Sequence, residues 1–415
     1  MLRKLVILLV ILKKVKSIKL NIAVIGQGYV GLPLSVTLAK FGHQVVGIDV
    51  DAERVKSLNQ GVSPIEDVPS SDLVKILESS KYIASMDYST VTNCDVVIIC
   101  VPTPLTSAGL VDLKFLKNSI IGLAEDLKKG ALVIVESTVA PGTVRNVVAP
   151  LIETLTNLPI DNFQLAFSPE RIDPRNKNWN VQNTPKIVAG LTSDSLKFAA
   201  QFYSSFIENV VQCESLEVAE TAKLLENSFR LINISFINEV SIFCQKLGID
   251  IENVIKAAAT KPYGFMPFYP GIGAGGHCIP VDPVYLADKA AEIGTPIKMI
   301  TVASEINKNM PSYFAGRAEE ILGELTGKRI IVIGLAYKPN VSDVRETPVE
   351  TLILGLRAKG ALVHWHDELV KEWNGEKSVN LSNQYDLAII ATFHDHMDLA
   401  LLGEVKILNT RGSNL

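Results

Sequence analysis

The sequence predicts an α/β protein with a doubly wound parallel sheet at the N-terminus, a central helical segment with one long helix, and a second α/β domain at the C-terminus. Short β-branched runs alternate with helical stretches in the N-terminal half, as in a parallel sheet covered on both faces. The stretch from Leu216 to Leu247 contains neither Gly nor Pro and is longer than a usual globular helix. A second buried run after Gly327 leads into another glycine turn.

The individual elements follow from the hydrophobic pattern. The first strand begins at Lys19, and the helix Leu32–Phe41 follows it and ends at Gly42. Further strands are expected at Gln44–Asp49, Val96–Val101, Ala131–Val135, Gln164–Phe167, Leu362–His366 and Asp386–Ala391. We therefore divide the chain into an extension (1–17), a first α/β domain (18–203), a helical domain (204–312) and a second α/β domain (313–415).

Composition and charge exclude several classes of partner. The chain has 415 residues, of which 47% are hydrophobic and 20% charged, as in globular proteins with large cores. Lys and Arg number 40 against 44 Asp and Glu, a net charge of −4 that offers no basic surface to nucleic acid or to an anionic membrane. The cysteines lack Cys-x-x-Cys spacing, which favours a reducing cytoplasm over a disulfide framework: Cys94, Cys100, Cys213, Cys244 and Cys278.

The N-terminal segment has an apolar run, Leu5–Leu12, between Lys and Arg residues. Its eight residues are too few to span a bilayer, which takes about twenty. No small-residue cleavage site follows, and the next segment is already a strand. We interpret residues 1–16 as an extension or a mis-set start, with peripheral membrane contact as the alternative and no integral membrane contact expected.

A glycine-rich turn joins the first strand to the first helix. It runs Gly26-Gln27-Gly28-Tyr29-Val30-Gly31 and fits Gly-x-Gly-x-x-Gly, in which N–H groups at the helix N-terminus bind a diphosphate. Asp49 ends the next strand, where an acid can bind ribose hydroxyls. The pattern predicts a Rossmann domain that binds NAD rather than NADP. Arg54 leaves open a contact with a 2′-phosphate, a contact with adenosine, or a solvated position at a helix start.

Cys278 lies in an unusual setting. Four glycines occur in the seven residues before it, and His277 and Asp282 flank it. Such glycines add nothing to a core and suit a backbone that approaches a ligand. Although most single cysteines are buried packing residues, this setting favours a nucleophile. We assign the other four cysteines to packing.

Polar residues also gather elsewhere. On the long helix, Lys223, Asn227 and Arg230 share one face, although exposed surface polarity is the default explanation for such a set. Two clusters follow expected strands, Glu136-Ser137-Thr138 and Ser168-Pro169-Glu170-Arg171. The carboxyl ends of parallel strands are where such sheets bind ligands.

Seven motifs, in this order, resemble the UDP-glucose/GDP-mannose dehydrogenase family from about residue 19 to the C-terminus. They are Gly-Tyr-Val-Gly (28–31), Val-Pro-Thr-Pro (101–104), Glu-Ser-Thr-Val (136–139), Ser-Pro-Glu-Arg (168–171), Lys223 with Asn227, Gly-Gly-His-Cys (275–278), and Gly-Leu-Ala-Tyr-Lys (334–338) with Asp343 and Arg345. Within the family, the residues around 168–174 and 260–271 look most like UDP-N-acetylglucosamine 6-dehydrogenases. The UDP-N-acetylmannosamine and UDP-glucose enzymes are near neighbours.

The resemblance implies a four-electron oxidation of a UDP-sugar at carbon 6, from alcohol through aldehyde to carboxylate, with two NAD molecules used in succession. Cys278 would trap the aldehyde as a thiohemiacetal and then form a thioester. By the same resemblance, Lys223 and Asn227 would hold the oxygen on carbon 6. Asp282 would assist proton transfer with Lys223, and Thr138 and Glu170 would place or activate water.

The resemblance also implies binding roles and partners. The cofactor would contact the glycine turn, Asp49, Arg54, Thr103, Thr138 and Arg345. The UDP-sugar would contact Glu170, Arg171, Ile172, Lys223, Asn227, Arg230, Phe268, Tyr269, Gly273 and Lys338. The domain 18–203 would bind NAD, 204–312 would contribute to dimerisation and the active site, and 313–415 would bind the UDP-sugar. A homodimer through the long helix in the cytoplasm is expected.

Departures from the family pattern bear on the sugar more than on the reaction. They are Arg175, Ile272 and Ala274, all in expected substrate loops. Two His-x-His units, His364/His366 and His394/His396, could suggest a metal, but we expect none. A two-electron hydroxyacid-type dehydrogenase would not need Cys278 or the second α/β domain. A catalytically silent nucleotide-sugar-binding protein would not need the reacting groups.

Overall fold

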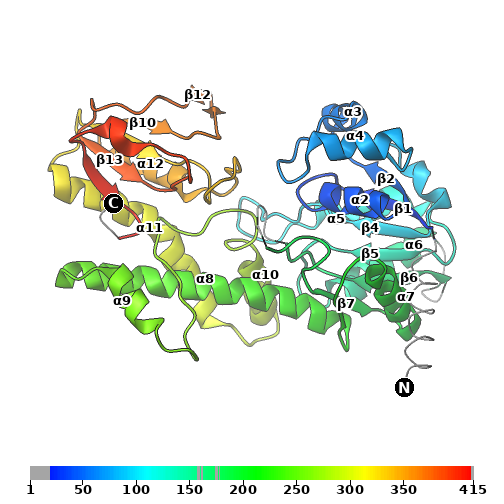
Figure 1. Ribbon diagram of the computed structural model, residues 1–415. Coiled ribbons are helices and arrows are strands. Elements are labelled where there is room, and N and C mark those ends of the chain that lie inside the picture. Colours follow the sequence, from blue (N-terminus) through cyan, green and yellow to red (C-terminus); the bar gives the residue numbers. More distant parts are fainter. Residues whose placement is uncertain (1–18, 157–158, 160–161, 173–175, 177, 413–415) are drawn as a thin grey trace, which may run out of the picture. The chain divides into compact units, whose positions relative to one another are not determined.

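The computed structural model describes residues 19–412 except 157–158, 160–161, 173–175 and 177. The expected extension (1–17) and Arg175 lie outside the described residues. The chain forms two compact units, residues 1–224 and 225–415, and the long helix α8 (Leu216–Leu247) has residues in both (Figure 1). The helix that the sequence predicts over these residues is therefore confirmed. Within the described ranges, no helix is long and apolar enough to cross a membrane.

The described part of the N-terminal unit contains an eight-stranded sheet in the order β3-β2-β1-β4-β5-β6-β7-β8. Its strands are β1 (Asn21–Ile25), β2 (Gln44–Ile48), β3 (Tyr82–Ser85), β4 (Val96–Ile99), β5 (Leu132–Val135), β6 (Gln164–Phe167), β7 (Lys186–Gly190) and β8 (Val210–Gln212). The strand order reverses beside β1, which places the turn after β1 at the switch point where such sheets bind ligands. The predicted doubly wound sheet is confirmed.

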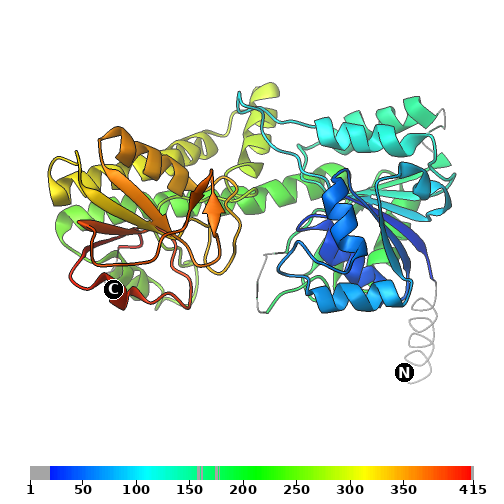
Figure 2. The ribbon, with the colours of Figure 1, turned by 90° about the horizontal axis from the view of Figure 1, so that it is seen from above.

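Helices cover both faces of this sheet (Figures 1 and 2). Along β1, Ile22 and Val24 pack into one core, whereas Ala23 and Ile25 pack into the other, which explains why the strand is apolar throughout. The helices are α2 (Gly31–Lys40), α3 (Ala52–Asn59), α4 (Ser70–Glu78), α5 (Lys114–Ala124), α6 (Ala149–Thr156) and α7 (Ser193–Ser204). Because β1 to β6 run parallel, the loops that follow them lie at one edge of the sheet.

Two strands of this sheet, β7 and β8, run opposite to the other six, against our expectation of a parallel sheet. β7 pairs with β6 in the antiparallel sense, with Phe167 opposite Ala189, whereas β8 pairs with β7 in parallel. β8 also carries the sheet past residue 203, into the segment that we had assigned to the central helices. Because β7 is antiparallel, it begins at the edge of the sheet where β6 ends.

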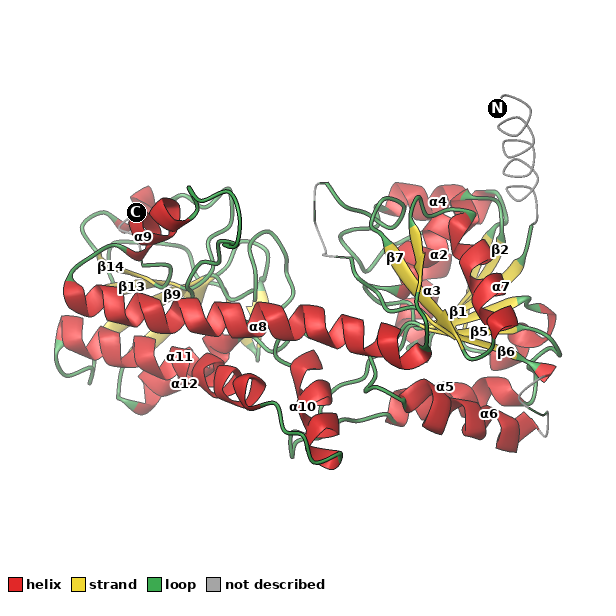
Figure 3. Ribbon diagram, turned by 90° about the horizontal axis from the view of Figure 1, so that it is seen from below, coloured by secondary structure: helices red, strands yellow, loops and turns green. Residues whose placement is uncertain are grey.

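Long helices dominate the first part of the C-terminal unit. Beyond residue 224, α8 is followed by α9 (Ile251–Ala258), α10 (Asp282–Glu292) and α11 (Lys298–Leu322). Within this unit α11 lies alongside α8 (Figure 3), and the Ser235 hydroxyl donates a hydrogen bond to the Ala303 carbonyl at 2.7 Å. α11 continues past residue 312, so it extends into the expected C-terminal domain.

The described part of the C-terminal sheet has four parallel strands in the order β10-β9-β13-β14. They are β9 (Arg329–Ile333), β10 (Leu362–His366), β13 (Leu387–Ile390) and β14 (Lys406–Asn409), with helix α12 (Pro348–Ala358) between β9 and β10 and a small hairpin, β11 (Glu372–Trp373) and β12 (Glu376–Lys377), after β10. Ile330 and Val332 of β9 face one core and Ile331 and Ile333 the other. The predicted second α/β unit is confirmed.

Candidate active site

The glycine turn after β1 has the geometry of a dinucleotide site. Gly26 has a φ of +90°, and a Cβ on Gly31 would lie 1.8 Å from the Gly26 carbonyl oxygen, so both positions require glycine. A Cβ on Gly28 would point into open space among the described residues. α2 begins at Gly31 without a side-chain cap from Val30, but its Leu32 N–H donates to the Gly28 carbonyl at 3.1 Å and Pro33 has no N–H, so N–H groups of the turn itself suit a diphosphate. The turn therefore fits NAD.

Asp49 and Arg54 lie together beside this turn. The buried Asp49 carboxylate accepts hydrogen bonds from the Gln27 N–H at 2.8 Å and the Asp51 N–H at 3.0 Å. The Arg54 guanidinium contacts the same carboxylate at 3.0 Å. Asp49 thus joins the second strand to the glycine turn, and Arg54 is an ion-pair partner of Asp49 rather than a simply solvated residue.

Thr103 and Thr138 join the loops that follow β4 and β5. The buried Thr103 hydroxyl donates to the Thr138 carbonyl at 2.9 Å, and the neighbouring Ser137 hydroxyl donates to the Val101 carbonyl at 2.7 Å. Both loops lie at the carboxyl edge of the sheet, where β4 is next to β1 and β5 is next to β4. The structure therefore brings together Thr138 and Thr103 as the motifs implied.

Glu220 fastens the Thr138 loop to α8, and sequence reasoning did not identify it. Its buried carboxylate accepts the N–H groups of Gly142 at 2.6 Å and Val144 at 2.9 Å. Burial raises the pKa of Glu220 to about 7 despite these two donors. Glu220 precedes Lys223 by about one helical turn, and its spacing from Lys223 is the only signal in the sequence.

Glu170 belongs to a buried charge cluster that sequence reasoning also missed. The Lys186 ammonium lies 3.3 Å from the Glu170 carboxylate and 2.9 Å from that of Glu136, and the Tyr203 hydroxyl donates to Glu136. We call Glu136, Glu170, Lys186 and Tyr203 the β7 charge cluster. Its members come from the ends of β5 and β6, the start of β7, and α7.

The segment after Glu170 turns back on that carboxylate. The Arg171 and Ile172 N–H groups donate to one Glu170 oxygen at 2.7 and 2.6 Å, and the Arg171 guanidinium donates to the Pro185 carbonyl at 2.9 Å. Arg171 therefore contributes to the shape of this loop. Burial alone would raise the pKa of Glu170, but Lys186, the two N–H groups and Lys223 hold it below its usual value.

The polar face of α8 is largely buried, contrary to the default explanation. Lys223 and Asn227 are 9% and 6% exposed, whereas Arg230 is exposed. The Asn227 amide donates to the buried Asp282 carboxylate at 2.5 Å, so a residue of α8 is paired with the first residue of α10. The sequence-based expectation coupled Asp282 with Lys223 and did not predict this contact.

Cys278 is exposed on a loop whose glycines have a structural role of their own. A Cβ on Gly275 would lie 2.7 Å from the Glu346 carbonyl oxygen, and one on Gly276 would lie 2.8 Å from the Tyr337 ring. Gly275 and Gly276 thus pack closely against the loop after β9, and the approach of the segment to a ligand stays a prediction. One turn after Cys278, the Asp282 N–H donates to the Cys278 carbonyl at 2.9 Å.

His277 and the remaining cysteines differ from Cys278 in their surroundings. Burial, with the charge of Arg345, lowers the pKa of His277 and favours the neutral imidazole. Cys94 and Cys244 are buried, and Cys100 and Cys213 pack against the cores of the N-terminal sheet. Burial raises the pKa of the Cys94 thiol to about 11. The assignment of these four cysteines to packing is confirmed.

The segment expected to surround the sugar is held by α8 and α11. The Phe268 ring packs edge-on against Phe229, with centroids 5.8 Å apart, and Tyr269 is exposed. Asn307 of α11 bonds both the N–H and the carbonyl of Ala274, at 2.6 and 3.0 Å. Gly273 lies next to Asn307, with a φ of +127°. Among the departures, Ile272 is buried in the C-terminal core.

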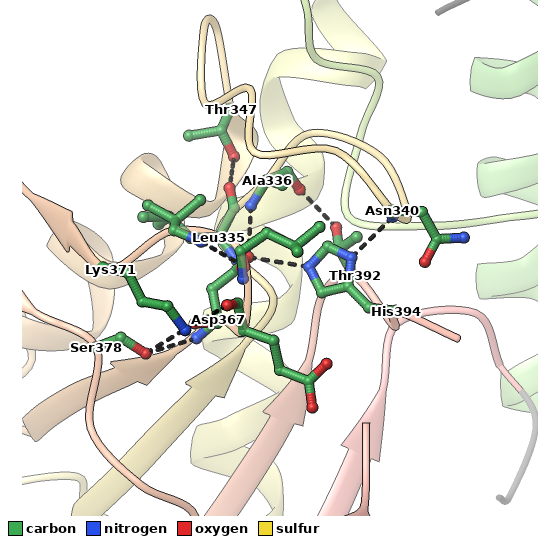
Figure 4. Close-up of polar contacts among 12 residues, drawn as sticks. Leu335, Ala336, Asn340, Thr347, Asp367, Lys371, Ser378, Thr392 and His394 are labelled. Atoms are coloured by element: carbon green, nitrogen blue, oxygen red, sulfur yellow. Dashed lines mark hydrogen bonds and ion pairs between the residues drawn. The ribbon is translucent and has the colours of Figure 1, made fainter. Parts of the chain in front are cut away.

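The loop after β9 carries Lys338 and Arg345. Lys338 is half-buried, and the Arg345 guanidinium forms a two-pronged contact with the Asp343 carboxylate, at 2.6 Å for its shortest bond. Asp367, at the end of β10, holds the start of this loop by accepting the Leu335 and Ala336 N–H groups at 2.7 and 3.0 Å (Figure 4). These two hydrogen bonds position the start of the loop on the sheet.

Three of the four histidines that suggested a metal make other contacts, and the fourth, His396, is exposed. The buried His394 ring accepts the Asn340 N–H through Nδ1 at 2.8 Å and contacts Asp367 through Nε2 at 3.2 Å (Figure 4). His366 bonds the Val379 carbonyl, and His364 packs against Tyr385. In the part of the chain that the structure describes, no group of three or more His, Cys, Asp or Glu side chains could hold a metal ion.

Comparisons with known proteins identify the family. Models of the UDP-glucose/GDP-mannose dehydrogenase family match the chain as its NAD binding domain (20–207), central domain (217–309) and UDP binding domain (331–411). The UDP-N-acetyl-D-glucosamine 6-dehydrogenase of Pseudomonas aeruginosa is 36% identical over 80% of this chain and 79% of its own. The UDP-N-acetyl-D-mannosamine dehydrogenase of Pyrococcus horikoshii is 35% identical over 90% of each chain.

Solved structures agree with this relationship. The UDP-D-ManNAc dehydrogenase structure from Pyrococcus horikoshii has a TM-score of 0.87 at 31% identity and covers 94% of this chain and 95% of its own. The UDP-N-acetyl-mannosamine dehydrogenase Cap5O from Staphylococcus aureus has a TM-score of 0.83 at 30% identity and covers 94% of both chains. The chain therefore belongs to the UDP-glucose/GDP-mannose dehydrogenase family and is an NAD-dependent UDP-sugar dehydrogenase.

Proposed function

We propose that this enzyme oxidises carbon 6 of UDP-N-acetylglucosamine from an alcohol to a carboxylate, with two NAD reduced per sugar. The observation that carries the proposal is the exposed Cys278, which lies on a loop of close-packed glycines. Asp282 follows it by one turn and accepts a hydrogen bond from Asn227 of α8. Relatives named UDP-N-acetyl-D-glucosamine 6-dehydrogenase, from Pseudomonas aeruginosa and Salmonella typhi, are 36% and 32% identical. The product uronate would serve the synthesis of surface polysaccharides or other glycans.

Cys278 supplies the covalent chemistry. NAD held at the glycine turn would supply the hydride acceptor for each of the two oxidations at carbon 6. The Cys278 Sγ forms a bond to the aldehyde carbon, which gives a thiohemiacetal and then, after the second oxidation, a thioester. Water attacks the thioester carbon, the C–S bond breaks, and the carboxylate leaves while Sγ regains its proton. The covalent bond retains the reactive aldehyde between the two oxidations.

The other candidate residues have roles set by their charge. Lys223, a buried cation, stabilises the negative charge that develops on the carbon 6 oxygen, and Asn227 orients the same oxygen. Asp282, which accepts the Asn227 amide, takes part in proton transfer with Lys223. Thr138 and Glu170 place and activate the water that cleaves the thioester.

Binding roles follow the same division. The glycine turn, Asp49 and Arg54 suit the diphosphate and ribose of NAD, and Thr103, Thr138 and Arg345 complete the proposed cofactor contacts. Lys338 contacts the UDP moiety. The sugar is enclosed by Arg171, Ile172, Arg230, Phe268, Tyr269 and Gly273. We keep the domain limits 18–203, 204–312 and 313–415 as the corresponding proposal.

A homodimer through α8 is also part of the proposal. Five apolar side chains, spaced by four or seven residues, share one helix face and are each 45–61% exposed: Leu225, Phe229, Phe236, Phe243 and Leu247. Such a stripe in contact with water favours association with a second copy. We place the enzyme in the cytoplasm, where reducing conditions keep the Cys278 thiol available.

The decisive experiment counts NADH formed per sugar at limiting UDP-N-acetylglucosamine, UDP-N-acetylmannosamine and UDP-glucose. We expect two NADH per molecule of UDP-N-acetylglucosamine. Cys278→Ser should abolish completed turnover without weakening NAD binding, whereas Cys213→Ser serves as the matched control with full turnover. One NADH per sugar, or an unchanged rate in Cys278→Ser, would contradict the thioester mechanism.

UDP-N-acetylmannosamine is the second candidate substrate. The relative from Pyrococcus horikoshii with that name is 35% identical and matches a larger share of the chain than the Pseudomonas aeruginosa enzyme does. Two NADH per molecule of UDP-N-acetylmannosamine, with none from the other two sugars, would reassign the substrate and leave the mechanism intact. No NADH from any of the three would point to another nucleotide sugar or to a catalytically silent binding protein.

A further inference from the structure

The β7 charge cluster is positioned by the one antiparallel pairing in the described N-terminal sheet. Phe167 lies opposite Ala189, so the same register continued beyond β6 places Lys186 opposite Glu170. The Ser168 hydroxyl donates to the Ile187 carbonyl at 2.8 Å and supports this continuation. Lys186 therefore approaches Glu170 from the first residue of a core strand, which restricts its position far more than a surface loop would.

One ammonium group is shared by two carboxylates. Lys186 is 2.9 Å from Glu136 and 3.3 Å from Glu170, and the three side chains are 7%, 0% and 17% exposed. Burial alone would lower the pKa of Lys186, but the two carboxylates raise it to about 12. Burial also raises the pKa of Glu136, because Lys186 offsets the cost of burial only in part. Charge within the cluster is thus tightly coupled.

The groups that act on Glu170 come from five elements. Lys186 of β7 and Lys223 of α8 favour its negative charge, as do the N–H groups of the following loop. Glu136 after β5 opposes this charge when it is ionised, whereas burial raises the pKa of the Cys100 thiol after β4 well above its usual value and keeps it neutral. Tyr203 of α7 acts indirectly, by donating a hydrogen bond to Glu136. Lys186 is the only one of these cations in direct contact with Glu170 among the ion pairs of the described residues.

We propose that Lys186 is a positioning residue that fixes the place and the charge of the Glu170 carboxylate, and that Glu136 competes for the same ammonium group. This inference rests on the proposed function, in which Glu170 activates the water that hydrolyses the thioester. A base must be ionised to accept a proton. Lys186 supplies the charge that keeps Glu170 in that form, and its contact with Glu136 limits how strongly it does so.

The proposal predicts effects on the acid side of the pH profile. Lys186→Gln removes the only contacting cation, so the pH below which kcat falls should rise by roughly 1–3 units. KM for the UDP-sugar should fall together with kcat and kcat/KM should change little, because hydrolysis comes after the steps that kcat/KM reports. The thioester on Cys278 should accumulate and be detectable as added mass on protein quenched in acid. Lys186→Arg keeps the charge and should keep the wild-type profile.

The double variant Glu136→Gln/Lys186→Gln makes the test specific. It removes a repelling carboxylate as well as the cation, so its acid limb should lie between those of Lys186→Gln and the wild type. If Lys186 had only a packing role, the second substitution in the same cluster would displace the acid limb further from that of the wild type. Lys197→Gln, which alters an exposed pair with Asp194 on α7, is the matched control with no expected change.

Each outcome decides the inference. An acid limb of Lys186→Gln at the wild-type pH would overturn it, as would a double variant displaced further than the single variant. If Lys186→Gln does not fold, the double variant must show an acid limb above that of Lys186→Arg, and equal profiles would overturn the proposal. Failure of the proposed function is seen separately, as one NADH or none per sugar in the wild-type enzyme.

Discussion

The turns after β1 and β9 begin alike, although they lie in different units. The Gly26 N–H bonds the Ile48 carbonyl at the end of β2, and the Gly334 N–H bonds the His366 carbonyl at the end of β10, at 2.7 and 2.8 Å. Both glycines have positive φ, at +90° and +83°. A Cβ would lie 2.6 Å from the Cys100 carbonyl oxygen in one case and 1.9 Å from that of Thr392 in the other.

The acid after the second strand also repeats. Asp49 follows β2 and accepts the Gln27 N–H at 2.8 Å, and Asp367 follows β10 and accepts the Leu335 N–H at 2.7 Å. Each acid thus bonds the residue directly after the glycine. The shared arrangement is a property of strand, glycine and acid, and the sequences alone were too different to establish it.

The two regions diverge at the helix that comes after each glycine. α2 begins five residues after Gly26 and has no side-chain cap, whereas α12 begins fourteen residues after Gly334 and is capped by Thr347, which accepts the Val349 N–H at 3.4 Å. The first arrangement brings the glycine turn directly to a helix N-terminus, where N–H groups of the turn suit a diphosphate. In the second arrangement, Thr347 caps the helix, and the long loop before it carries the cations Lys338 and Arg345. The same scaffold therefore carries two different turns, and we propose that they hold nucleotides in different ways.

The largest expected effect tests the different use of the two acids. Asp367→Ala removes an acceptor from four N–H groups and His394 in a buried site, and we expect a loss of roughly 3–5 kcal/mol in unfolding free energy. Trp fluorescence during urea unfolding follows the C-terminal unit, because Trp365 is buried there. Asp49→Ala, the matched change, should lower the unfolding free energy by less. Equal losses in the two variants would contradict the different use of the two acids.

Ligand affinity should separate the two regions next. Asp49→Asn removes a charged acceptor beside the proposed ribose, so KM for NAD should rise roughly 10- to 100-fold with KM for the UDP-sugar unchanged. Lys338→Met should do the reverse. Steady-state kinetics with each substrate varied in turn measures both effects. A change in the same constant in both variants would show that the two turns do not serve separate ligands.

The charge of Asp367 should appear in the pH dependence of stability. Burial alone would raise the pKa of Asp367, but His394 and main-chain N–H groups lower it to about 2, below the ordinary value of 3.8. A lowered carboxyl pKa stabilises the fold above that ordinary value, and this stabilisation, about 2 kcal/mol, is lost as the pH falls from about 4 to 2. Urea unfolding of the wild type and Asp367→Asn across this range should therefore converge at low pH. A constant difference would contradict the assignment.

The smallest expected effect concerns the helix cap. Thr347→Ala removes the acceptor for Val349 and the donor to the Leu335 carbonyl at 2.8 Å, which should lower the unfolding free energy by about 1 kcal/mol. Thr347→Ser retains the hydroxyl and should stay near the wild type in the same urea titration. If Thr347→Ser lost as much unfolding free energy as Thr347→Ala, the effect would come from the methyl group rather than from the cap.

Local sequence determined most of the elements and several site residues. Strands buried on both faces need continuous apolar runs, and the limits of α8 follow from a stretch without Gly or Pro. The glycine turn and Asp49 obey a spacing set by backbone geometry, so their positions were predictable from that spacing alone. Cys278 was singled out as a candidate because the glycines before it suit close backbone approach rather than a core, and its role stays a prediction.

Tertiary structure alone decided the contacts between distant segments. Nothing near Lys186 in the chain indicates that β7 runs antiparallel, yet that direction sets Lys186 opposite Glu170. The Asn227–Asp282 bond likewise joins residues 55 positions apart. Hydrophobic period and turn chemistry act over a few residues, whereas the partner of a buried charge depends on which strands become neighbours. The sequence thus determined which chemistry is present, and the fold determined which groups hold it in place.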